Sequence, residues 1–101
     1  MTALPADAAP YRRTPTFTEE TLPAGLRANH STRAGVWALI VVEEGEVDYH
    51  VGGSVERLRP GRPGVAPPEV THHLAPVGPL RVHVEFWSRE RGAHEGGGPR
   101  A

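Results

Sequence analysis

Hydrophobic and polar residues alternate with a period of two along much of the chain, which is typical of β-strands with one buried face. The alternation is strict over EVDYHV (46–51) and LRVHVEFW (80–87). VWALIVVE (36–43) is a nearly continuous apolar run instead, as expected for a strand covered on both sides. Shorter strands are predicted within 26–31, 55–61, 62–69 and 70–76.

Glycine and proline separate these segments. The chain holds 12 glycines and 11 prolines in 101 residues, and helices of ordinary length do not persist between such breakers. Turns are expected at 31–35, 43–46, 52–54 and 77–79. About seven or eight short strands joined by Gly/Pro turns predict an all-β sandwich or barrel.

The length allows one small domain with a single core. Residues 1–10 (MTALPADAAP) are small and Pro-rich and are predicted to be a flexible arm. Residues 90–101 (ERGAHEGGGPRA) are Gly-rich and polar and are predicted to be a disordered tail. The folded domain is therefore expected to span 11–89.

Charge and composition narrow the classes of function. Eleven basic residues nearly balance twelve acidic ones, for a net charge of −1, so no concentrated basic face for nucleic acid is expected. The absence of cysteine excludes disulfides and thiolate metal sites, but not a site of histidine and carboxylate. No apolar run approaches the ~20 residues of a membrane span, and the N-terminus does not resemble a secretory signal. A cytoplasmic protein without membrane contact is the expectation.

Histidines are the main candidates for chemistry, and there are six of them. His50 shares a strand face with Glu46 and Asp48, and a solvated face explains it; His94 lies in the predicted tail. His72 and His73 are neighbours on an extended segment, so their side chains must point to opposite sides. The prolines before them hold the entry to this segment rigid, which favours an inward His72 and an outward His73.

Two further residues complete a candidate metal site. His30 shares the Leu26/Ala28 face if that segment is extended, where a hydrogen-bonded core histidine is the alternative interpretation. Glu85 lies on the strand 80–87, opposite Val82, Val84 and Phe86, and periodicity does not decide which of these two faces is inside. If Glu85 faces inward, then His30, His72 and Glu85 form a site of two imidazoles and a carboxylate with open positions, suited to Zn, Fe, Mn, Ni or Co.

Two long stretches also resemble a known family. YRRTPTFTEETLPAGLRANHSTRAGVWALIVVEEGEV (11–47) and RPGVAPPEVTHHLAPVGPLRVHVEFW (62–87) are similar to the TehB/YeaR-like domain family. The most specific parts are TP-x-F, LPAG-x-x-x-x-H, GVW-x-x-x-V-x-x-G, PP-E-x-x-H and the final V-E-F. Members occur as small proteins or fused to the N-terminus of tellurite-resistance methyltransferases, but nothing in 101 residues resembles a methyltransferase domain.

The resemblance implies a cupin-like, antiparallel double-stranded β-helix (a jelly roll), usually with a metal-binding cavity. It places His30 and His72 at the two histidine positions and Glu85 at the acidic one. PPEVTH also follows the second cupin motif, P-x-G-x-x-H, with Glu69 where glycine is common. The H-x-H pair of the first cupin motif is absent, so the usual cupin enzyme site cannot be assumed.

Three functions follow as hypotheses. The first is a small metal-binding protein, with zinc expected and iron, manganese or nickel as alternatives. It would hold a small anion or polar metabolite in its cavity and be linked to tellurite, oxidative or oxyanion stress. The candidates for neutralising such an anion are Arg27, Arg33 and Arg81.

The second hypothesis is a metal-dependent enzyme of dioxygenase or isomerase type, with Glu69 or His83 as acid or base. The third is a metal-free scaffold for interactions. A homodimer is also expected, because Val82, Val84 and Phe86 would need the cover of a twofold partner if Glu85 faced inward.

Overall fold

A computed structural model describes residues 4–28 and 30–89, and within them the chain is almost entirely antiparallel β-sheet. This confirms the predicted all-β class. The elements in chain order are β1 (Ala9–Arg13), β2 (Phe17–Thr18), α1 (Ala24–Arg27), β3 (Trp37–Val51), β4 (Ser54–Leu58), β5 (Gly64–Ala66) and β6 (His72–Ser88).

Two long bent strands form the centre of the sheet. β3 runs through both segments predicted at 36–43 and 46–51, and β6 runs through those predicted at 70–76 and 80–87. The expected turns at 43–46 and 77–79 are therefore wrong: the chain bends there without reversing. The bend has a local cause, because the β3–β6 register shifts between Val42 and Glu44 and again between Gly45 and Val47.

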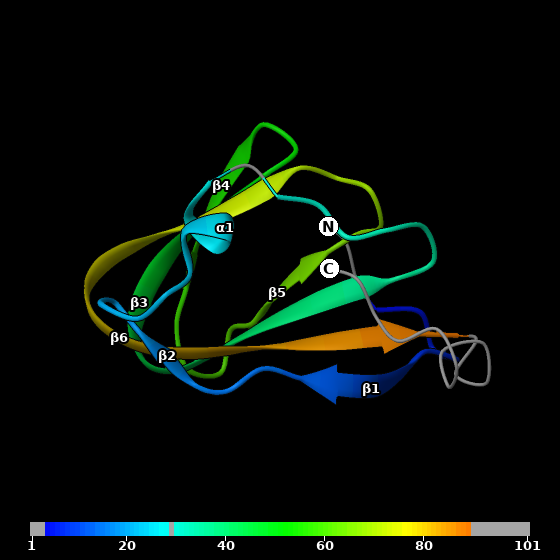
Figure 1. Cartoon of the computed structure of the whole chain (residues 1–101), viewed down its shortest axis with the longest axis horizontal. Helices are drawn as coiled ribbons and strands as arrows, with labels where there is room; N and C mark the ends of the chain where they lie inside the picture. Colours follow the sequence, from blue (N-terminus) through cyan, green and yellow to red (C-terminus); the bar gives the residue numbers. More distant parts are fainter. Residues whose placement is uncertain (1–3, 29, 90–101) are drawn as a thin grey trace.

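The sheet folds over on itself at this bend. The strand order is β1-β6-β3-β4, with β2 also paired to β6 and β5 also paired to β3. The first half of β6 pairs with the second half of β3, and the second half of β6 pairs with the first half of β3. Figure 1 shows both strands curving around the left-hand end of the molecule, so that their two halves lie in separate layers.

The core lies between these layers. Its fully buried side chains come from β3, β4, β5 and β6 and from Val36 just before β3, and the largest apolar ones are Tyr49, Ile40, Leu58, Leu74, Val36, Val47 and Val82. Tyr49 connects the layers directly, because its hydroxyl donates a hydrogen bond of 3.0 Å to the carbonyl oxygen of Val65 in β5. The tight packing around its ring needs a glycine at 64, where an added Cβ would lie 2.9 Å from Tyr49 Cδ2.

The faces of β6 are opposite to those that an inward Glu85 requires. Val82, Val84 and Phe86 are buried in the core, at 0%, 3% and 7% exposure. They need no partner subunit to cover them, so this reason for expecting a homodimer is wrong, although the homodimer itself stays a prediction. Their apolar burial decides the orientation of the strand, since each such side chain contributes about 1.5–3 kcal/mol when it is removed from water.

The N-terminal part differs from the prediction in two places. β1 begins at Ala9, inside the segment predicted to be an arm, and pairs with the end of β6. The extended segment predicted at 26–31 begins as the single helical turn α1 instead, because Pro23 fixes its entry and the amide of Leu26 bonds to the Pro23 carbonyl. The predicted tail, 90–101, lies outside the described residues.

In the ranges that the structure describes, no helix has the length and apolar character needed to cross a membrane.

Candidate functional site

His30 and His72 lie side by side at the edge of the core. Their backbones pair as an isolated antiparallel bridge, with the His30 amide 2.8 Å from the His72 carbonyl and the His72 amide 2.7 Å from the His30 carbonyl. Their rings meet edge to face, with centroids 5.3 Å apart and planes at 84°. Two residues separated by 42 positions are thus held together by main-chain bonds, which fix the spacing of their imidazoles.

His72 is the inner member of this pair. Its residue is 4% exposed, whereas His73 is half-buried and faces the other way, as the sequence predicts. Nδ1 of His72 lies 3.0 Å from the carbonyl oxygen of Val70, which makes Nδ1 the protonated nitrogen and leaves the lone pair on Nε2. Burial lowers the pKa of His72, with smaller contributions from the charges of His30 and His73, so the ring is neutral at pH 7.

This pKa shift predicts a stability change in mild acid. As the pH falls from 7.5 to 5.5, the unfolded chain takes up a proton at His72 near the ordinary pKa of 6.5, whereas the folded chain takes it up only at a lower pH. The free energy of unfolding should therefore fall, by at most about 1.4 kcal/mol per pH unit. Urea unfolding at both pH values, with a chelator present, measures this fall.

The matched variants are His72→Gln, which should remove this part of the fall, and His73→Gln, which should keep it. Glu19 and Glu43 also lose stabilisation in acid, because hydrogen bonds lower the pKa of each, but only below their ordinary value of 4.5. An unchanged pH dependence in His72→Gln would show that another group is responsible.

A pocket opens onto His30 from the outside. It has a volume of about 260 Å³ and lies between β1, β2, α1 and β6, lined by Arg12, Thr14, Phe17, Pro23, Gly25, Leu26, His30 and Phe86. A small inner extension of about 10 Å³ shares Leu26, His30 and Phe86 with it and is also lined by His72. The walls of the pocket are mostly apolar and Arg12 is its exposed charged residue, while His30 lines both the pocket and the small extension next to His72.

Glu85 does not join the two histidines. It lies on the opposite face of β6, where Oε1 accepts a hydrogen bond of 3.0 Å from Trp87 Nε1 and Oε2 lies 3.3 Å from His83 Nε2. The predicted convergence of His30, His72 and Glu85 is therefore corrected to a pair without the carboxylate. Among the residues that the structure describes, no three His, Asp or Glu side chains are placed to hold one metal ion.

Glu85 belongs instead to a chain of polar groups on the outer face. Its partner His83 is 5% exposed and places Nδ1 2.7 Å from Oε2 of Glu43, which also accepts a 2.7 Å hydrogen bond from Thr16. The Thr16 bond, and then the His83 bond, lower the pKa of Glu43. With both ring nitrogens on carboxylate oxygens, His83 has a structural role and lies away from the pocket.

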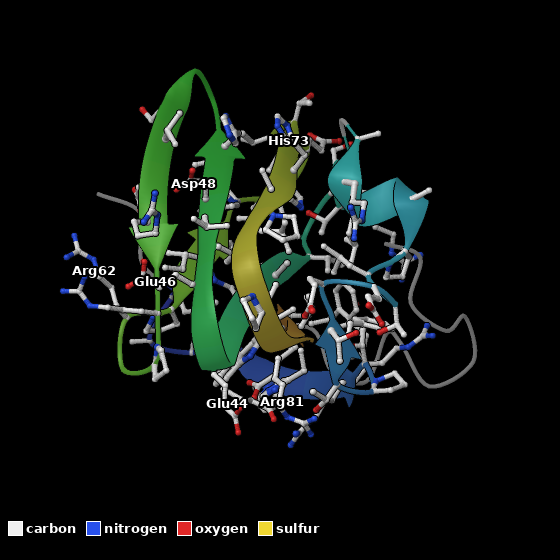
Figure 2. The ribbon with its side chains drawn as sticks, turned by 90° about the vertical axis from the view of Figure 1, so that its left-hand side faces the viewer. Glu44, Glu46, Asp48, Arg62, His73 and Arg81 are labelled. Carbon is white, nitrogen blue, oxygen red and sulfur yellow. The ribbon has the colours of Figure 1, made fainter. Side chains whose placement is uncertain are left out.

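The other residues suggested by the sequence also lie elsewhere. Arg27 bonds to the carbonyls of Leu22 and Glu19 and so supports its own loop. Arg81 pairs opposite Glu44 at the bend of the sheet, and Figure 2 shows both at the same lower end. Arg33 is half-buried near the Tyr11 hydroxyl.

Glu69, the suggested acid or base, is exposed and has a positive φ of 65°, which explains why glycine is common at that motif position. The pocket residue that the sequence did not indicate is Arg12. It stands at the border of the predicted arm, and only the alternation of the adjoining segment could have indicated that it belongs to a strand.

Comparison with known proteins agrees with this architecture. The family model of the TehB-like domain matches residues 12–84. The chain belongs to the TehB-like domain family. None of the curated proteins matches the chain.

Solved structures show that this TehB-like domain has a cupin fold. A protein of E. coli (strain K12) superposes with a TM-score of 0.78 at 24% identity, over 86% of this chain and 96% of that one. TehB from Haemophilus influenzae superposes with a TM-score of 0.80 at 18% identity, over 90% of this chain but only 35% of TehB. The cupin domain of Schizosaccharomyces pombe Cnp3 gives a TM-score of 0.59 at 11% identity, over 79% of this chain and 57% of that one. The resemblance that the sequence suggested is thus confirmed for family and fold.

Proposed function

We propose that this TehB-like domain binds a small organic anion in the pocket between β1, β2, α1 and β6. The observation that carries the proposal is the lining of the pocket, which has mostly apolar walls, an exposed Arg12 and His30, with a small extension beyond His30 that is lined by His72. An anion with a compact apolar body fits these surroundings, because the walls offer apolar contact and a guanidinium binds carboxylates well.

The inner histidines determine which chemical group suits the end of the ligand that lies away from Arg12. His72 is neutral and its Nε2 carries a lone pair, so this atom accepts a hydrogen bond. His30 is half-buried and lines both the pocket and its inner extension. A ligand with an acidic group near Arg12 and a hydroxyl or amide group near His72 would satisfy both ends.

A divalent metal ion bound together with the anion is a second candidate. The protonated Nδ1 of His72, held by the Val70 carbonyl, is the arrangement that histidine ligands of metals commonly have. The donor set fits in part: His30 and His72 offer two nitrogens, and the remaining positions would fall to the ligand or water. Two imidazoles suit zinc, with iron, manganese or nickel as alternatives, and the anion would supply the charge that the missing carboxylate does not.

Neither suggested acid or base lies in the pocket, since His83 is on the outer face and Glu69 is exposed on its loop. Binding is therefore proposed ahead of catalysis. The family is associated with tellurite and oxyanion stress, and tellurite is itself a small anion. Tellurite is therefore included among the probes.

Backbone NMR of the isotope-labelled protein can test the proposal with benzoate, benzyl alcohol and tellurite as probes, each with and without zinc. We expect benzoate to shift the amide signals of Leu26 and His30, and the neutral alcohol to bind more weakly. Arg12→Gln should weaken benzoate about three- to tenfold, which is less than a buried charged hydrogen bond would give because Arg12 is exposed.

Arg62→Gln is the matched control, because it removes the same charge from a residue outside this pocket. It should leave the affinity unchanged. If Arg12→Gln behaves like Arg62→Gln, or if no probe shifts the pocket amides, then the proposal is wrong. If zinc strengthens the binding of benzoate or tellurite in the wild type but no longer does so in His72→Gln, the metal candidate is supported.

A further inference from the structure

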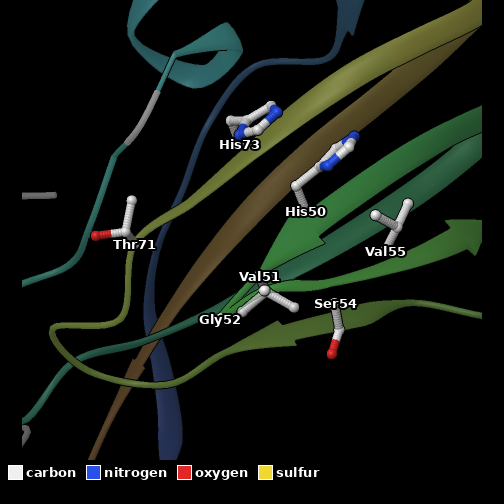
Figure 3. Close-up of a pocket in the computed structure, with 8 residues that line it drawn as sticks. His50, Val51, Gly52, Ser54, Val55, Thr71 and His73 are labelled. Carbon is white, nitrogen blue, oxygen red and sulfur yellow. The ribbon is translucent and has the colours of Figure 1, made fainter.

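A second pair of histidines lies on the outer side of the same strand. His50 in β3 and His73 in β6 are directly opposite each other in the antiparallel register. Their rings are stacked, with centroids 4.2 Å apart and planes at 10°, and Figure 3 shows them face to face. Because His72 and His73 point to opposite faces of β6, this outer pair is separate from the inner pair of His30 and His72.

The outer pair borders an open hollow of about 480 Å³. The Gly52–Gly53 turn between β3 and β4 lines it, together with Ser54 and Thr71. Both rings are half-buried, and Figure 3 shows them among the residues that line this hollow. A ligand held by the two rings therefore has room beside it for water molecules.

The charges next to the pair favour a cation. Glu46 and Asp48 precede His50 on the same face of β3, and both carboxylates bind one guanidinium, that of Arg57, at 2.9 Å and 2.6 Å. Two carboxylates against one guanidinium leave one net negative charge. Asp48 and His50 are close enough for their charges to interact, and Figure 2 shows Asp48 and His73 on one side of the molecule.

We propose that His50 and His73 form a surface site for a divalent transition metal ion, Cu²⁺, Zn²⁺ or Ni²⁺. Imidazole nitrogen is a preferred ligand of these ions. Each ligand nitrogen would lie about 2.1 Å from such an ion, with its in-plane lone pair directed at it. The stacked rings are nearly parallel, so their lone pairs do not converge as they stand. Rotation of the two side chains toward the hollow would direct both lone pairs at one ion, and water would complete the coordination.

The alternative is that the rings only stack on each other. Stacking does not use the in-plane lone pairs of the imidazole rings, so these stay available to an ion. Two fixed strands hold these donors, which lowers the entropy cost of bringing them together at one ion. Protons compete for the same nitrogens, so binding should weaken in acid.

The test uses the full chain without a His-tag. Zn²⁺ affinity is measured at pH 7.5 by competition with a chromophoric chelator, and bound Cu²⁺ is examined by electron paramagnetic resonance. We expect two nitrogen ligands in the Cu²⁺ spectrum. His50→Gln and His73→Gln should each weaken Zn²⁺ at least about tenfold, since loss of even an outer-shell partner of a metal ligand costs about 10–100-fold.

His94→Gln, in the C-terminal segment, is the control and should keep the affinity. Circular dichroism checks that every variant is folded. Wild-type affinity in both His50→Gln and His73→Gln would overturn the proposal, as would loss of the ion in His94→Gln alone. Because the inner pocket is tested with benzoate and Arg12→Gln, the two proposals can fail separately.

Discussion

Replacing Tyr49 with alanine is expected to lower the free energy of unfolding by about 3–5 kcal/mol, the range for deletion of a buried aromatic ring. Tyr49 is 1% exposed and is the largest of the fully buried side chains. Its ring extends from β3 and packs against Gly64 of β5, and its hydroxyl donates a hydrogen bond to the Val65 carbonyl across the fold. The variant would lose both the apolar contacts and the link between the two layers. Urea unfolding followed by circular dichroism measures the change.

Tyr49→Phe separates these two contributions. It keeps the ring and removes only the hydroxyl, so the expected loss is about 0.5–1.5 kcal/mol, somewhat more if the Val65 carbonyl stays without a partner. Equal losses in Tyr49→Phe and Tyr49→Ala would mean that the hydrogen bond, and not the packed ring, holds the layers together. A loss under about 1 kcal/mol in Tyr49→Ala would show that the ring is not part of a close-packed core.

The core and the candidate site share this tyrosine. The rings of Tyr49 and His72 lie edge to face with centroids 6.1 Å apart, so the Tyr49 ring helps to shield His72 from solvent. The burial that lowers the pKa of His72 therefore has the same origin as the stability of the fold. The neutral imidazole of His72 is therefore mainly a consequence of packing, to which the charges of His30 and His73 add smaller contributions.

The sequence contains most of the information needed for the strands, because alternation of period two is a local property. The segments 46–51 and 80–87 are both strands in the structure. What the local pattern does not contain is whether a glycine between two strands reverses the chain or bends it. EEGE looks like a hairpin turn, but Gly45 lies inside β3 because its partner for pairing is the distant β6. Long-range pairing overrides the local turn signal here.

In the candidate site too, local strand geometry predicts some features, and long-range packing decides the others. The opposite orientations of His72 and His73 follow from strand geometry alone, and the structure confirms them. The placement of Glu85 required a choice between two faces, and alternation cannot make that choice. The apolar side chains Val82, Val84 and Phe86 decide it, since burying them is favourable and burying a lone carboxylate is costly.

The cupin fold therefore comes with a reduced set of inner donors in this member of the TehB-like domain family. Its pocket has two imidazoles, and the third expected donor serves the outer face beside His83 and Trp87. This arrangement favours a ligand that brings its own charge. It is the physical reason for testing anions before metals at the pocket.

Gly45→Ala is expected to be the second strongly destabilising change, with a loss of about 2–5 kcal/mol. Gly45 has φ 83°, which costs an ordinary residue about 1–2 kcal/mol. In addition, a Cβ there would lie 2.1 Å from the carbonyl oxygen of Pro79, so the backbones of β3 and β6 would have to separate at the bend. Overpacking of this kind typically costs about 1–3 kcal/mol. Chemical denaturation of the purified variant gives the value.

Gly61→Ala separates the clash from the backbone strain. Gly61 has almost the same φ, 84°, but an added Cβ would meet nothing within 4 Å. Its loss should therefore be only the part due to positive φ, about 1–2 kcal/mol. The difference between the two variants then measures how closely β3 and β6 approach where the sheet folds over. If both variants lose the same stability, the strands can move apart at the bend at no cost, and the close approach of Gly45 to Pro79 is not what holds the two layers in place.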